Sequence, residues 1–66
     1  MSELTTTMKV QRAKLDLTQA ELATLAEVTR KSINAIEAGR MVPSIVLALR
    51  LAKALGVPVE ELFSLA

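Results

Sequence analysis

The chain has 66 residues, no cysteine, no histidine and a formal net charge of +1. These features exclude disulfides, thiolate zinc sites and imidazole-based nucleophilic catalysis, so we expect no enzyme activity, no cofactor and no bound metal. The composition is 52% hydrophobic and 23% charged, and its abundance of alanine and leucine favours one all-α domain over residues 1–66. No stretch resembles a signal peptide or a membrane span, so we expect a cytoplasmic protein with no membrane partner.

The first expected helix follows a polar leader, residues 1–6. The run Thr5–Thr7 offers hydroxyl groups that can cap a helix, and we expect the helix to run from there to about Lys14. Asp16 tolerates the left-handed conformation better than most residues, which suits the end of a helix.

A second helix is indicated by a capping box. Thr18 is followed three residues later by Glu21, so each side chain can bond the backbone amide of the other. Apolar residues then follow at helical spacing, at Leu22, Leu25 and Ala26. The pattern breaks at Glu27, which predicts a helix of about eight residues.

The third expected helix has a basic first turn. Thr29 is its cap, and Arg30, Lys31 and Ser32 come directly after it. Ile33 and Ile36 are expected to face inward. Gly39 can adopt the left-handed conformation that ends a helix.

Two more helices complete the chain. Ser44 follows Pro43 and caps a helix over about residues 45–55, which Gly56 ends. Pro58 is placed to open a short fifth helix. Since no strand pattern is evident, we expect a compact bundle of five helices.

The unit from Thr18 to Ala38 consists of two short helices and a tight turn, which is the spacing of a helix-turn-helix. In such a unit the N-terminal residues of the second helix contact base edges in the major groove. Here these residues are Arg30 and Lys31, and Arg can bond guanine O6 and N7 together. Glu37 is the single acid between Thr29 and Arg40. Spacing and charge therefore predict double-stranded DNA as the partner.

Beyond this unit, a longer pattern resembles the phage repressor and Cro-like (XRE-type) helix-turn-helix family. It is carried, in chain order, by Leu17–Ala23, Val28–Arg30, Ile33–Arg40, Pro43–Ser44, Leu51–Val57 and Glu61–Phe63. The match covers roughly residues 8–63. The resemblance implies a lambda-repressor-like bundle of five helices, with the helix-turn-helix in helices two and three, that acts on transcription as a homodimer.

The resemblance also implies roles for individual side chains. Arg30 and Lys31 match the main base-reading positions, and Ala35 falls one turn later on the same face. Asn34 lies beside that face and is expected to join the base-reading set, with contact to the DNA backbone as the alternative. The positions that contact phosphate are Gln19, Thr29, Ser32 and Arg40. Arg12 and Glu37 match a structural ion pair between the first and third helices.

Three positions depart from the family pattern. Gln11 stands where an apolar residue is common, so we expect the first helix to pack more lightly. Glu27 stands where the turn usually has glycine, and a left-handed residue with a side chain costs roughly 1 kcal/mol. Ala35 has no polar group, so it can offer a base only an apolar contact, such as one with a thymine methyl.

The C-terminal segment carries a surplus of apolar side chains, which favours a homodimer interface. The residues expected there are Val59, Leu62, Phe63 and Leu65, next to Ile45 and Val46 of the fourth helix. The alternative is that Leu62 and Phe63 close the core of the monomer.

A competing function is a protein-interaction module that no longer binds DNA. Control by a regulatory partner protein is also left open.

Overall fold

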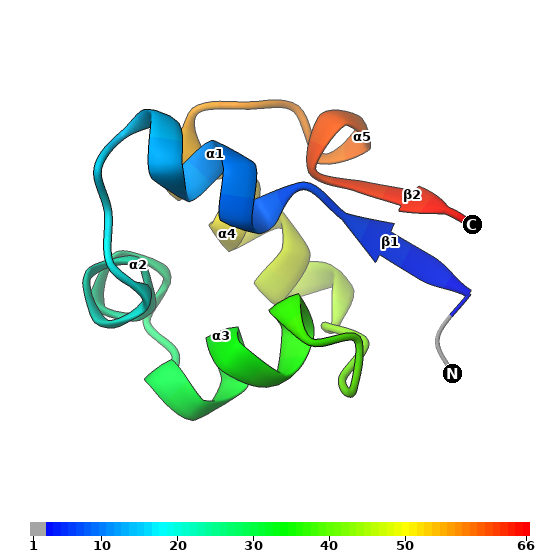
Figure 1. Ribbon diagram of the computed structural model, residues 1–66, viewed down its shortest axis with the longest axis horizontal. Helices are drawn as coiled ribbons and strands as arrows, with labels where there is room; N and C mark the ends of the chain where they lie inside the picture. Colours follow the sequence, from blue (N-terminus) through cyan, green and yellow to red (C-terminus); the bar gives the residue numbers. More distant parts are fainter. Residues whose placement is uncertain (1–2) are drawn as a thin grey trace.

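The computed structural model describes residues 3–66, which form five helices and a two-stranded sheet (Figure 1). The elements in chain order are β1 (Leu4–Thr6), α1 (Met8–Lys14), α2 (Gln19–Ala26), α3 (Arg30–Glu37), α4 (Ile45–Leu55), α5 (Val59–Leu62) and β2 (Phe63–Leu65). The five expected helices are present and the fold is mostly helical, but it also contains a small two-stranded sheet that the sequence did not predict.

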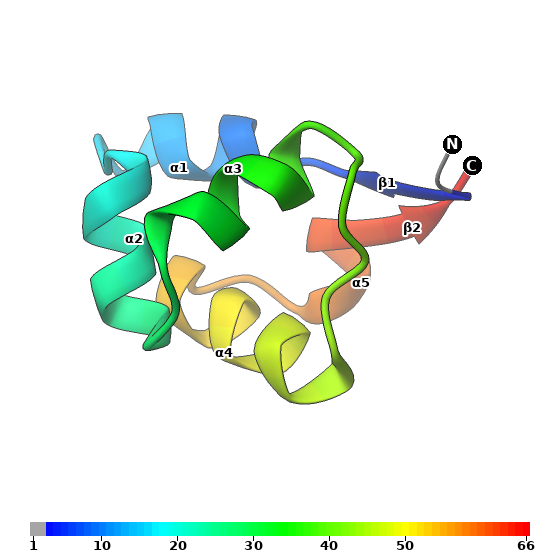
Figure 2. The same cartoon turned by 90° about the horizontal axis from the view of Figure 1, so that it is seen from below.

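The sheet joins the two ends of the chain, as Figures 1 and 2 show. β1 and β2 pair antiparallel, with Leu4 opposite Leu65 and Thr6 opposite Phe63. Residues 4–6 therefore form a strand rather than a leader, in keeping with the preference of β-branched threonine for extended backbone. Met1 and Ser2 of the expected leader lie outside the described residues.

The threonines of this segment bond the C-terminal segment. The Thr7 hydroxyl does not cap α1 and instead donates to the Glu61 carbonyl oxygen at 2.7 Å. The Thr6 hydroxyl donates to the Leu62 carbonyl at 2.9 Å and accepts from the Met8 amide at 3.1 Å. These bonds hold the start of α1 against α5.

The three central helices begin at the expected caps. Thr18, Thr29 and Ser44 each accept a hydrogen bond from the amide three residues later, at 3.0–3.2 Å. The Glu21 carboxylate accepts from the Thr18 amide at 2.8 Å, which completes the capping box. Short polar side chains thus fix where these helices start.

Four helices end in the same hydrogen-bond motif. The backbone turns left-handed at Asp16, Glu27, Gly39 and Gly56, which follow α1, α2, α3 and α4. In each case the amide of the next residue donates to the carbonyl five residues before it, at 2.9–3.1 Å. This is the Schellman motif, in which the carbonyls of the last turn gain partners.

The residue after each left-handed position is usually apolar and packs on the core. Leu17, Val28 and Val57 do so and are partly buried. Arg40 occupies the equivalent place after α3 and is exposed. The motif therefore turns the chain inward after α1, α2 and α4, and leaves a cation on the surface after α3.

Every helix contributes to one apolar core. Its buried members are Met8, Leu22, Ala23, Ala26, Ile33, Ile36, Leu47, Leu51, Ala52, Leu55 and Leu62. Leu25 does not face this core as its spacing suggested, because 57% of it is exposed. In Figure 2, α3 lies on the near side between α1 and α4, with α2 at one end and the sheet at the other. Among residues 3–66, none of the helices has the length and apolar character needed to cross a bilayer.

Candidate nucleic-acid interface

The first turn of α3 presents positive charge to solvent. Arg30 and Lys31 are exposed, and neither forms an ion pair within the described residues. Asn34 and Ala35 follow them by four residues each, so they lie one turn further along the same face. Asn34 is exposed and Ala35 is half-buried. An α-helix with its side chains is about 10–12 Å in diameter, which matches the width of the major groove, about 12 Å.

The cap of α3 organises the hydroxyl groups beside this face. The Thr29 hydroxyl oxygen accepts from the Ser32 amide at 3.2 Å, and its hydrogen goes to the Ser32 Oγ at 3.1 Å. The hydroxyl hydrogen of Thr29 is therefore used inside the protein. Ser32 keeps its own hydrogen for an outside acceptor.

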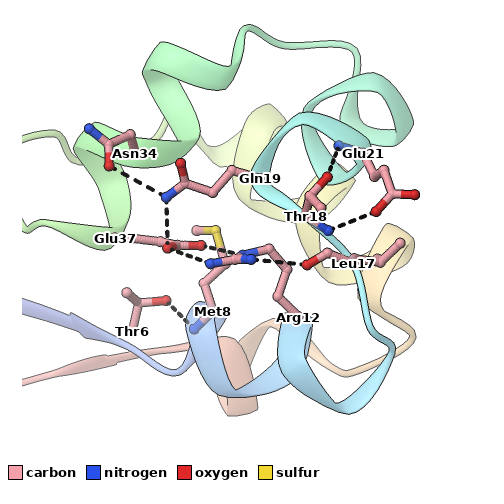
Figure 3. Close-up of polar contacts among 9 residues, drawn as sticks. All are labelled: Thr6, Met8, Arg12, Leu17, Thr18, Gln19, Glu21, Asn34 and Glu37. Atoms are coloured by element: carbon pink, nitrogen blue, oxygen red, sulfur yellow. Dashed lines mark hydrogen bonds and ion pairs between the residues drawn. The ribbon is translucent and has the colours of Figure 1, made fainter.

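The acid of α3 is turned inward onto α1, as Figure 3 shows. Arg12 Nε donates to Glu37 Oε2 at 2.8 Å, and Arg12 Nη2 donates to Glu37 Oε1 at 3.0 Å. The exposed fractions of the two side chains are 15% and 4%. Arg12 Nη1 also donates to the Leu17 carbonyl at 2.9 Å, so the guanidinium ties α1, α3 and the loop before α2 together.

The ion pair keeps Glu37 charged but hidden. Burial alone would raise the pKa of Glu37, but the hydrogen bonds from Arg12 and Gln19 and the nearby positive charge outweigh it, and the pKa is lowered. The carboxylate is therefore neutralised within the protein, and its charge does not oppose that of Arg30 and Lys31 on the outer face.

Gln19 is held by α3 through its side chain. Its Nε2 donates to Glu37 Oε1 at 3.1 Å and to Asn34 Oδ1 at 3.4 Å (Figure 3). Both amide hydrogens thus have partners inside the protein, whereas the sequence predicted that this side chain would contact phosphate. The backbone N–H of Gln19 lies in the first turn of α2 and has no partner within the helix.

The turn between α2 and α3 is left-handed at Glu27, with φ 58° and ψ 46°. A glycine would adopt this conformation without steric cost, and the glutamate adopts it nonetheless. The turn therefore has the geometry expected of glycine, with strain held in the backbone. Arg40, at the far end of α3, is exposed and lies beyond the C-terminal turn.

The sequence did not reveal that Gln19 bonds Asn34 and Glu37, which stand 15 and 18 residues away. Only the packing of α2 on α3 brings them together.

The chain is similar to known helix-turn-helix proteins. The family model described as helix-turn-helix matches residues 8–62. A transcriptional regulator of the helix-turn-helix type from Methanothermobacter thermautotrophicus is 48% identical over 61 residues, which cover 91% of this chain and 88% of the relative. A regulator of the same type from Bacillus subtilis is 40% identical over 56 residues, or 85% of each chain.

A solved structure is also similar. It is the restriction-modification controller protein C.AhdI from Aeromonas hydrophila, which matches with a TM-score of 0.79 and 31% sequence identity. The match covers 82% of both chains.

Proposed function

The chain belongs to the helix-turn-helix family of transcriptional regulators, and from this we propose that it is a sequence-specific regulator that binds an inverted-repeat operator as a homodimer. The observation that carries the proposal is the electrostatic division of α3. Arg30 and Lys31 face solvent in its first turn, while its single acid is paired with Arg12. Cations near a helix N-terminus are unfavourable because they oppose the helix dipole. An anionic ligand such as DNA would offset this cost and so explain why they are placed there.

The contacts to DNA divide into two kinds. Arg30 reads guanine, because its planar fork matches O6 and N7, and Lys31 reads a neighbouring base or a phosphate. Ala35 offers its methyl group to a thymine methyl. Arg40 and the Ser32 hydroxyl hold the backbone of the duplex, and these contacts set register without choosing sequence.

Gln19 and Thr29 contribute to phosphate binding without donating from their side chains. Gln19 reaches phosphate through its backbone N–H at the start of α2, since its side-chain amide is occupied. Thr29 contributes by orienting Ser32, because its own hydroxyl hydrogen already goes to the Ser32 Oγ.

The size of the molecule sets how many copies an inverted repeat requires. Successive major grooves on one side of a duplex are about 34 Å apart, whereas the longest extent of this chain is 26 Å. One copy presents one recognition helix, so reading two successive grooves takes two copies. Two copies related by a twofold axis read an inverted repeat, with half-site centres about 10 base pairs apart.

The dimer surface that we propose combines the C-terminal segment with the start of α4. Ile45 and Leu65 are 78% and 83% exposed. Val46 is exposed too, and Val59 and Phe63 are partly buried. Leu62 has no exposed surface and belongs to the monomer core, so we leave it out of the interface that the sequence predicted.

The test of function first selects an operator for the protein from random duplex DNA. It then compares the binding of two arginine variants to this selected operator and to single-base variants of it, at two salt concentrations. Arg30→Ala should weaken cognate binding by about 1–3 kcal/mol and flatten the preference at one base position. Arg40→Ala should weaken all sequences alike and lower the salt slope by about one. An unchanged ranking of base variants with Arg30→Ala would show that Arg30 is not the reading residue.

A salt titration on random duplex DNA separates this function from a protein-interaction module. Counterion release should make the affinity fall steeply as salt rises. The absence of measurable binding even at low salt would favour the interaction module and contradict the proposal.

A further inference from the structure

We propose that Gln19 is a positioning residue that holds Asn34 with its NH₂ group outward, so that Asn34 acts as a hydrogen-bond donor to DNA and selects against bases that present an amino group. The inference rests on the proposed function and deepens it, because it assigns a chemical preference to one reading position. It follows from a chain of contacts that begins at Arg12.

The first step fixes the orientation of the Gln19 amide. Glu37 accepts two hydrogen bonds from Arg12, so it is an ionised carboxylate with no hydrogen to donate. The Gln19 group that lies 3.1 Å from Glu37 Oε1 must therefore be the NH₂. A flipped amide would place two acceptors against each other.

The second step fixes Asn34. An amide nitrogen carries two hydrogens, and the second hydrogen of Gln19 Nε2 is directed at Asn34 Oδ1, 3.4 Å away. The oxygen of Asn34 is thus turned toward α2. Figure 3 shows the Asn34 nitrogen pointing away from Gln19.

The third step is the consequence for base recognition. A free asparagine reads adenine with both ends of its amide, accepting from N6 and donating to N7. With its oxygen held by Gln19, Asn34 presents donors. Guanine offers two acceptors in the major groove and thymine offers one, whereas cytosine offers only an amino donor. Asn34 should therefore favour guanine or thymine and disfavour cytosine. It should gain less from adenine, whose amino group lies beside its single acceptor.

The test measures binding of the full chain to single-base variants of its selected operator. Asn34→Ala first identifies the base that Asn34 faces, as the position where discrimination is lost. At that position the unmodified protein should bind guanine about tenfold better than cytosine. Asn34→Asp removes the donors and supplies acceptors, so it should place cytosine above guanine. A purely structural role would not invert this order.

Gln19→Met removes the donors of the positioning residue while keeping its length. The Asn34 amide is then free to rotate, so adenine should become a favoured base at this position and the discrimination against cytosine should shrink. Gln11→Met is the matched control, because Gln11 is the other glutamine, lies on α1 and donates to the Thr7 hydroxyl just before that helix. The control should keep the original ranking.

Different results overturn different claims. Weaker binding to all sequences with Gln19→Met, without a change in ranking, would overturn the inference and indicate a direct phosphate contact by the side chain. A preference of the unmodified protein for adenine at the Asn34 position would overturn it as well. If the unmodified protein binds no sequence specifically, the proposed function fails first.

The geometry can be tested without DNA. In a ¹H–¹⁵N spectrum of the free protein, Asn34→Ala should shift the side-chain amide signals of Gln19 and leave those of Gln11 in place. If the Gln19 signals do not move, the hydrogen bond to Asn34 is absent and the inference fails even where the protein binds its operator.

Discussion

Among single residues, Arg12 does the most to connect the fold with the DNA-facing surface. Its guanidinium reaches the Leu17 carbonyl and both oxygens of Glu37, so it links three parts of the chain. Glu37 in turn accepts from Gln19, which touches Asn34 on the outer face. A buried pair is thus one end of a polar network that ends at a candidate reading residue.

Removing one partner of this pair should strongly destabilise the fold. Glu37→Gln or Arg12→Met leaves a mostly buried charge without its counterion, and we expect a loss of about 3 kcal/mol in the free energy of unfolding. Urea denaturation at neutral pH measures this loss. Arg50→Met is the control, because Arg50 is exposed on α4 and should change stability by less than about 0.5 kcal/mol. Equal, small losses in all three variants would mean that the pair contributes little.

The same pair should make stability depend on pH in the acid range. Since folding lowers the pKa of Glu37, the stability it contributes is present above its unfolded pKa, about 4.3, and is lost as the pH falls through the lower folded pKa. Glu37→Gln should therefore lose less stability than the unmodified protein between about pH 5 and pH 3. Folding also lowers the pKa of Glu21, through hydrogen bonds from Thr18, but that contribution stays in both proteins. Parallel pH profiles would contradict the assignment.

Sequence patterns located the residues of the candidate site better than they described their contacts. Charge and position in α3 are local properties, so Arg30 and Lys31 could be placed on an exposed first turn. The partners of Gln19 depend on how α2 packs on α3, which no local pattern encodes. Its side chain therefore lies against Glu37 and Asn34 rather than free for a phosphate.

At the scale of elements, the helix boundaries were predictable because caps are local. Thr18, Thr29 and Ser44 bond amides three residues away, and such spacing can be read directly from a sequence. The strands were not predictable. Each has three residues, too few to show alternation, and Thr5 meets a partner 59 residues away at Ser64.

The four left-handed helix ends provide a matched series for measuring backbone strain. Glu27→Gly removes the side chain that is strained in the left-handed conformation. It should raise the free energy of unfolding by about 0.5 kcal/mol, after the entropy cost of glycine is included. Asp16→Gly should gain less, since aspartate tolerates this conformation better. Gly56→Ala should lose about 1 kcal/mol. A Cβ at Gly56 would meet nothing within 4 Å, so that loss reports backbone strain alone.

Thermal melts under one buffer condition measure the series. In a domain of this size, 1 kcal/mol corresponds to a shift of about 4–8 °C in the melting temperature. A fall in melting temperature with Glu27→Gly would show that the Glu27 side chain stabilises the turn by more than its strain costs.

At the scale of the whole molecule, the sheet and the exposed apolar side chains have separate roles. β1 and β2 pair residues 4–6 with residues 63–65 beside α5, so the C-terminal segment is held in place rather than free. Leu65 on β2 and Ile45 at the start of α4 remain open to solvent. Apolar side chains held on a rigid surface lose little entropy when a second copy covers them.

This surface predicts a dimer that a single charge can dissociate. Ile45→Asp or Leu65→Asp places a carboxylate on each side of a twofold interface, where burial without a counterion is unfavourable. Sedimentation equilibrium at tens of micromolar should show a dimer for the unmodified protein and a monomer for these variants. Leu25→Asp is the control, since Leu25 is 57% exposed on α2 and outside the proposed surface. It should remain dimeric.

The same variants connect assembly with operator binding. A dimer gains affinity for an inverted repeat because its second α3 binds the second half-site without a separate association step. The charged variants should therefore bind a single half-site with the same affinity as the unmodified protein. On the full repeat they should lack the additional affinity that the dimer gains. If the unmodified protein sediments as a monomer and binds both kinds of site equally, the twofold arrangement is wrong. The reading face of α3 would then act alone, and the operator would be a single half-site.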